Sequence, residues 1–179
     1  KTPHIALTVL EVLDAIGVRY EVMGGNAICC GIQQFKQGDA KTAGRVGYNS
    51  IERLGRAGAS RVIAWCPSCH IQFTEVALPA YAQTHGEAPF DMAPVATFLA
   101  EHLDELRKHF VKPVNKRVAI QKRSALPEVV AAVDTILRAI PGLEVVDLGT
   151  PVVSTQSVHL NVVPKYKAEL YKQEFEAAH

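Results

Sequence analysis

Residues 61–70 read RVIAWCPSCH, so a short apolar segment runs directly into two cysteines separated by a proline and a serine. The segment Arg61–Ala64 predicts a buried strand, and the residues after it, from about 68 to 83, predict a helix. Ligand sites in α/β proteins are commonly built at the carboxyl ends of strands. Cys66 and Cys69 therefore stand where such a site is expected.

The other two cysteines are adjacent in sequence and are followed by a glycine, as Cys29-Cys30-Gly31. Residues 19–23, just before them, are predicted to form a second short strand. Four thiols grouped in two loops after strands predict ligands that converge on one metal centre. The alternative is that the cysteines are small buried apolar side chains. A disulfide framework is less expected, because a chain of 179 residues with 48% hydrophobic composition and no apolar signal segment can bury a core unaided.

The spacing of the thiols leaves two kinds of metal centre open. Structural zinc takes four ligands in a closed tetrahedron, commonly from two Cys-x-x-Cys turns, and an adjacent cysteine pair fits that arrangement awkwardly. An iron–sulfur cluster offers several iron atoms, so neighbouring thiolates can each bind a different one.

The composition argues against several other classes of protein. Lys and Arg number 19 against 18 Asp and Glu, which gives a net charge of +1 and no field that would recruit nucleic acid or anionic lipid. No apolar run approaches the length of a membrane span, so we expect a soluble, cytoplasmic protein. The chain opens with Lys-Thr-Pro rather than methionine, and we expect part of the native sequence to precede it.

Helix-like and strand-like patterns alternate along the remaining sequence. Helices are predicted at residues 3–16, 39–54, 95–110, 127–140 and 164–177, and strands at 90–91, 117–121 and 143–148. The clearest helix is 95–110, whose apolar stripe includes His102 as a packing residue. This alternation predicts an α/β fold with short, mainly parallel sheets flanked by helices.

The two halves of the sequence resemble each other at an offset of 124 residues. Pro3 aligns with Pro127, and Ile16 aligns with Ile140. We therefore predict two tandem related α/β units, the first over residues 1–111 with the metal site and the second over residues 112–179 without cysteines. The counterpart of the strand at 117–121 falls before the first residue, so the missing upstream segment is expected to supply a strand.

The segments GGNAICCG (24–31) and WCPSCH (65–70) resemble the cysteine-rich CCG domain family. That family includes cysteine-rich subunits of heterodisulfide reductase and related iron–sulfur oxidoreductase subunits. Its pattern is one cysteine, then CCG, then Cys-Pro-x-Cys, often in two copies. The leading cysteine would fall before Lys1, and the second copy has lost its cysteines.

The resemblance implies a [4Fe–4S] cluster, noncubane in heterodisulfide reductase, held here by Cys29, Cys30, Cys66 and Cys69. It implies an oxidoreductase subunit that transfers electrons to a disulfide or thiol substrate. The sequence has no flavin or nicotinamide motif, so flavin or iron–sulfur partner subunits are expected as donors, in a complex that is cytoplasmic or peripheral to a membrane. The alternative is a zinc-binding structural or docking subunit without catalysis. His70 is a further candidate for a ligand or a proton donor.

Overall fold

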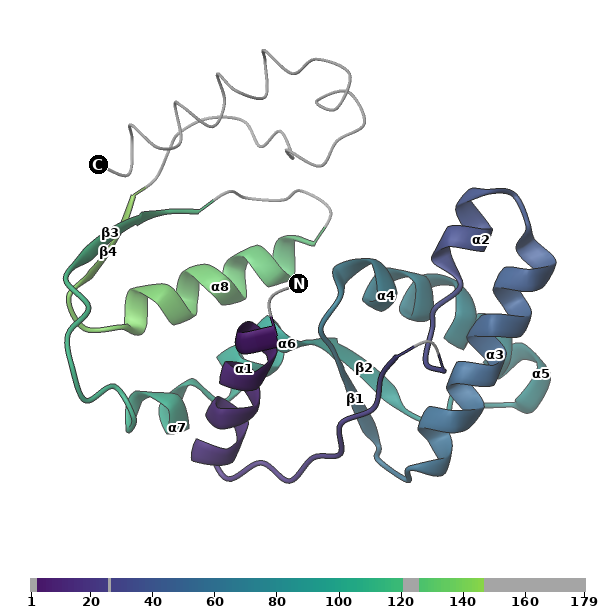
Figure 1. Cartoon of the computed structure of the whole chain (residues 1–179), viewed down its shortest axis with the longest axis horizontal. Coiled ribbons are helices and arrows are strands. Elements are labelled where there is room, and N and C mark those ends of the chain that lie inside the picture. Colours follow the sequence, from purple (N-terminus) through teal and green to yellow (C-terminus); the bar gives the residue numbers. More distant parts are fainter. Residues whose placement is uncertain (1–2, 26, 121–125, 147–179) are drawn as a thin grey trace, which may run out of the picture. The chain divides into compact units, whose positions relative to one another are not determined.

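The computed structural model describes residues 3–25, 27–120 and 126–146 (Figure 1). The chain divides into two compact units. One unit is Gly17–Phe98, which contains all four cysteines and is called the cysteine unit below. The other consists of Lys1–Ile16 and Leu99–His179.

The cysteine unit is built around two parallel strands, β1 (Arg61–Ala64) and β2 (Asp91–Pro94). The chain between them is helical and comprises α4 (Pro67–Ile71), η1 (Gln72–Ala77) and α5 (Leu78–His85). Strand, helical crossover and parallel strand form a βαβ unit, which is the usual way to join parallel neighbours. The strand predicted at 61–64 is confirmed, and so is the helical segment that follows it.

The crossover contains a π-helical segment, η1, which the sequence pattern did not predict. Pro79 lies at the start of α5, directly after this segment. A proline inside a helix lacks the N–H donor, and its ring clashes with the carbonyl four residues earlier. A wider π turn just before Pro79 relieves that clash while the helix continues.

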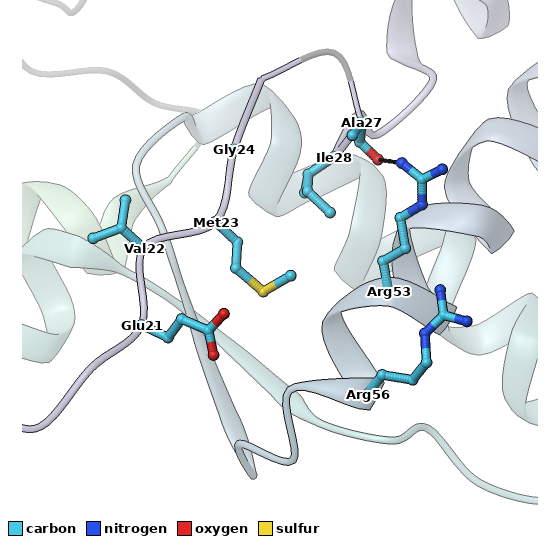
Figure 2. A pocket seen from close by; sticks show the side chains of 8 residues that line it. All are labelled: Glu21, Val22, Met23, Gly24, Ala27, Ile28, Arg53 and Arg56. Carbon is cyan, nitrogen blue, oxygen red and sulfur yellow. Dashed lines mark hydrogen bonds between the residues drawn. The ribbon is translucent and has the colours of Figure 1, made fainter.

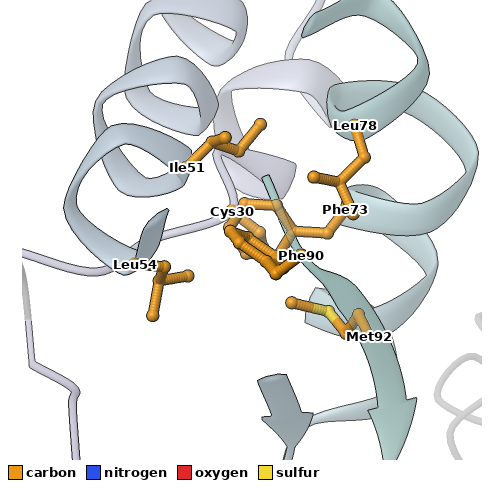
Figure 3. Close-up of a cluster of buried hydrophobic side chains, with 7 residues drawn as sticks. All are labelled: Cys30, Ile51, Leu54, Phe73, Leu78, Phe90 and Met92. Carbon is orange, nitrogen blue, oxygen red and sulfur yellow. The ribbon is translucent and has the colours of Figure 1, made fainter. Parts of the chain in front are cut away.

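Two helices precede β1, namely α2 (Ile32–Lys36) and α3 (Ala40–Arg56). Asp39 caps α3 as predicted, because its carboxylate accepts a 2.9 Å hydrogen bond from the backbone N–H of Thr42. Figure 3 shows the core that α3, the crossover helices and β2 enclose. The buried side chains of this core are Cys30, Ile51, Leu54, Phe73, Leu78, Phe90 and Met92.

The strand predicted at residues 19–23 does not form, since residues 18–24 are neither helix nor strand. Tyr20 and Val22 are 40% and 67% exposed, so the apolar residues of this segment do not face a core. Alternating apolar residues make a strand only where a neighbouring strand supplies hydrogen bonds and a buried face. The recorded sheet partner of β1 is β2, and residues 19–23 join neither.

The second unit contains another parallel pair, β3 (Lys116–Ala119) and β4 (Leu143–Val146), joined by α8 (Pro127–Ala139). It also includes α1 (Pro3–Ala15) and α7 (Leu103–Arg107). The prediction of helix α8 and of its flanking strands is confirmed within the described residues. Helices with short parallel sheets confirm the predicted α/β class.

The single helix predicted over 95–110 is wrong. The chain forms α6 (Val95–Glu101) and then α7, with His102 between them at φ −103° and ψ 23°. Neither glycine nor proline marks this break, so the apolar periodicity continued across it without revealing it.

The 124-residue offset is visible in two helices. Helices α1 and α8 are both 13 residues long, and Pro3 and Pro127, like Ala15 and Ala139, are 124 positions apart. The correspondence ends at the next element, because β4 is a strand and residues 19–22 are not. The boundary near residue 111 stays a prediction, and the helix predicted at 164–177 lies outside the described residues. Within the described ranges, no helix combines the length and the apolar character that a membrane crossing requires.

Candidate metal centre

The second cysteine motif begins where β1 ends and continues into helix α4. Cys66 is the last residue before the helix, with extended backbone angles (φ −95°, ψ 121°), and Pro67 opens the helix. Proline suits this position because its fixed φ is helical and the first turn has no use for its missing donor. The carbonyl of Cys66 accepts a 3.0 Å hydrogen bond from the N–H of His70. Cys66 is thereby exposed at the strand end, while Cys69 lies half-buried in the first helical turn.

The first cysteine motif approaches helix α3 so closely that only glycine fits after the cysteine pair. Gly31 adopts a left-handed conformation (φ 75°, ψ 8°) just before α2. A Cβ atom there would lie 2.6 Å from the carbonyl oxygen of Ala43. Both the conformation and the approach exclude larger residues. The preceding residue, Cys30, is 2% exposed and belongs to the core.

Ser50 of α3 fixes the backbone of Cys29. The Cys29 N–H donates to Ser50 Oγ at 2.9 Å, and the Ser50 hydroxyl donates to the Cys29 carbonyl at 2.7 Å. Ser50 is itself only 1% exposed. This serine was not identified from the sequence, because nothing near it in the chain relates it to a motif 21 residues earlier.

The structure brings together three of the four thiols. The Cys69 thiol has the Cys30 and Cys66 sulfurs as hydrogen-bonding neighbours. Burial raises the pKa of Cys69, and the nearby Cys30 and Cys66 groups raise it further. Burial also opposes ionisation of Cys66, but hydrogen bonds from the backbone and side chains of Cys69 and Ser68 outweigh it, and the pKa of Cys66 lies below its usual value. Two thiols from the second motif and one from the first thus share one site.

The fourth predicted ligand, Cys29, is placed by its backbone bonds to Ser50 and is half-buried. In the described residues, no three His, Cys, Asp or Glu side chains are already arranged around a single ion. The donor set itself fits a thiolate-bound centre, since sulfur ligands suit zinc and iron–sulfur clusters alike. Cys29, Cys30, Cys66 and Cys69 as a complete ligand set stays a prediction.

Two buried polar atoms in the helices after the cysteine motifs lack a protein partner. They are Nδ1 of His70, next to Cys69, and Oε1 of Gln34, on α2 shortly after Cys30. Buried polar groups are nearly always hydrogen-bonded, so such atoms call for a partner. Cluster sulfurs accept hydrogen bonds, and these bonds tune a cluster's potential. The orphaned atoms are therefore compatible with a bound cluster.

Comparison with known proteins gives the same assignment for the cysteine motifs. Residues 2–74 match the cysteine-rich domain family named CCG. The chain is 26% identical over 150 residues to a dihydromethanophenazine:CoB--CoM heterodisulfide reductase subunit of Methanosarcina mazei, and 23% identical to the corresponding protein of Methanosarcina barkeri. These alignments cover 80% of this chain and 36% of each relative, so the chain spans little more than a third of their length. No solved structure matches.

The matched residues contain CCG at 29–31 and the Cys-Pro-Ser-Cys run that starts at Cys66. Through residues 2–74, this chain belongs to the cysteine-rich CCG domain family.

Proposed function

We propose that this chain is an iron–sulfur subunit of a heterodisulfide reductase-like oxidoreductase. Its cluster is a [4Fe–4S] centre, cubane or noncubane, bound by Cys29, Cys30, Cys66 and Cys69. The observation that carries the proposal is the contact of Cys69 with both Cys30 and Cys66, which come from separate loops of the cysteine unit. The similarity to heterodisulfide reductase subunits supports the same reaction class.

The protein's own residues would give such a centre one anchored side and one accessible side. Cys30 is packed in the core beside Phe73 and Phe90, so its sulfur has a fixed position. Cys66 is exposed, and Trp65 before it is 54% exposed. A substrate would therefore approach over Trp65 and Cys66. When bound, the cluster supplies one-electron transfer.

The proposed reaction requires two electrons and two protons for each disulfide. The S–S bond breaks, both sulfurs are reduced, and two thiols leave. The electrons come from partner subunits that carry flavin or iron–sulfur groups, and the protons come from solvent at the exposed side of the site. We place this complex in the cytoplasm or at a membrane surface, and we assign no metal to residues 112–179.

The experiment uses anaerobically reconstituted protein that has been reduced with dithionite and freed of excess reductant. On mixing with 2-hydroxyethyl disulfide, the proposal predicts release of two thiols for every two electrons lost, together with a change in the visible spectrum. Protein loaded with zinc is the control and should release none. Equal thiol release from the zinc-loaded control, or none from the iron-loaded protein, would overturn the proposal. A chain that retains only zinc would be a structural or docking subunit instead.

A further inference from the structure

An open pocket of ≈ 390 Å³ lies in the cysteine unit between the end of α3 and the segment that leads to the cysteine pair (Figure 2). Its volume is in the range of small-molecule sites. It is distinct from the thiol cluster, and Ile28, which precedes Cys29, lies in its wall. The lining residues are Glu21, Val22, Met23, Gly24, Ala27, Ile28, Arg53 and Arg56.

Two arginines from the last turn of α3 form one wall of this pocket. Arg53 Nη1 donates a 2.9 Å hydrogen bond to the carbonyl of Ala27, which holds its guanidinium across the end of the loop. Arg56 follows three residues later, and Figure 2 shows the two guanidinium groups on the same side, one above the other. Among the ion pairs recorded for the described residues, none involves either arginine.

Arginines at a helix carboxyl end are favoured by the helix dipole, which accounts for their presence but not for a pocket between them and an apolar surface. Neighbouring like charges repel, and an oxyanion between two guanidinium groups removes that repulsion through charge-assisted hydrogen bonds. Arg53 is also pre-positioned by its bond to Ala27, which reduces the entropy lost on binding.

The remaining walls restrict the kind of anion that fits. Val22 and Met23 are 67% and 36% exposed, and Ile28 is half-buried beside them. These side chains offer an apolar surface next to the two positive charges. Glu21 lies on the wall opposite the arginines (Figure 2). Its carboxylate disfavours a second negative charge and can accept a hydrogen bond from a ligand hydroxyl or ammonium group.

We propose that this pocket binds a small organic oxyanion. The carboxylate or phosphate is held by Arg53 and Arg56, and a short alkyl segment covers Met23 and Ile28. Binding needs neither a metal nor the cysteine thiols, so the inference goes beyond the proposed redox function and is tested separately from it.

The test is isothermal titration calorimetry of the full chain with butyl phosphate and with hexanoate. The probe that binds more tightly identifies the head group. The test variant is Arg56→Gln, because Arg56, unlike Arg53, makes no recorded hydrogen bond whose loss would disturb the loop. Losing one charge-assisted contact should weaken binding about ten-fold. The control is Arg45→Gln, which removes the same charge from the same helix outside the pocket.

Two further comparisons separate a pocket from a merely positive surface. Butyl phosphate should bind at least about five-fold more tightly than methyl phosphate, since each buried methylene contributes about four-fold in water. Glu21→Gln should strengthen binding of the anion. Thermal melting of each variant checks that it folds. No binding of either probe to the unmodified chain, equal weakening by Arg45→Gln and Arg56→Gln, or equal affinity for the butyl and methyl esters would overturn the proposal.

Discussion

Replacing Gly31 by alanine should disrupt the first cysteine motif through two separable effects. The first is conformational, because φ at Gly31 is 75°, in the left-handed region. A residue with a Cβ atom loses about 1–2 kcal/mol in that conformation. The second is steric, because the new Cβ would lie 2.6 Å from Ala43 O and 3.1 Å from Ala43 Cα. Both atoms are backbone, so the clash is relieved only if the loop and α3 move apart, and overpacking of this kind costs about 1–3 kcal/mol.

The matched control is Gly38→Ala. Gly38 has a similar φ of 84°, and a Cβ atom there meets nothing within 4 Å. The control should therefore lose only the conformational part, about 1–2 kcal/mol. Gly31→Ala should lose the sum, about 2–5 kcal/mol, which is a large fraction of a typical unfolding free energy of about 5–15 kcal/mol.

Urea denaturation of the metal-free, reduced protein measures these losses. The chain has one tryptophan, Trp65, and it lies in the cysteine unit, so its fluorescence follows the unfolding of that unit. Iron uptake on reconstitution should also fall in Gly31→Ala and persist in Gly38→Ala. Equal losses of unfolding free energy in the two variants would show that the approach of Gly31 to α3 contributes nothing, and the reasoning about this motif would be refuted.

Two other predictions concern hydrogen bonds of α3. Ser50→Ala leaves the N–H and carbonyl of Cys29 without their partner and should lower the unfolding free energy by about 1–3 kcal/mol, whereas Ser68→Ala, at an exposed position, should change it little in the same urea assay. Tyr81 donates a 2.5 Å hydrogen bond to Glu52, which raises the pKa of Tyr81 to about 12. The neutral phenol is the stabilised form, so this contribution is complete below pH 10 and is lost as the pH rises towards 12. Absorbance at 295 nm measures the titration, and a midpoint that Glu52→Gln does not lower would contradict this cause.

Local sequence signals predicted the elements whose boundaries are set locally. Arg61–Ala64 is a strand bounded by its own neighbours, and Asp39 caps α3 with its own side chain. Pro127 opens α8 for a similar local reason. By contrast, residues 19–23 carry a strand-like pattern but no recorded strand pairs with them, and pairing is a property of the whole fold. Pro79 was a readable signal for the π segment that precedes it.

The candidate site divides in the same way. The two motifs drew attention to Cys30, Cys66 and Cys69, and the structure places these thiols as neighbours. Ser50 could not be predicted, because its role exists only once α3 lies against the cysteine loop. The function of Gly31 needed the same contact, although a glycine after two cysteines indicated a special backbone conformation.

The most direct test of the central claim is the iron and acid-labile sulfide bound per chain after anaerobic reconstitution, with electron paramagnetic resonance of the reduced protein. A complete [4Fe–4S] centre predicts about four iron and about four sulfide per chain. Serine in place of any one of Cys29, Cys30, Cys66 or Cys69 should lower the iron content or alter the resonance signal. One zinc per chain with no sulfide, or iron binding that none of the four substitutions affects, would contradict the claim.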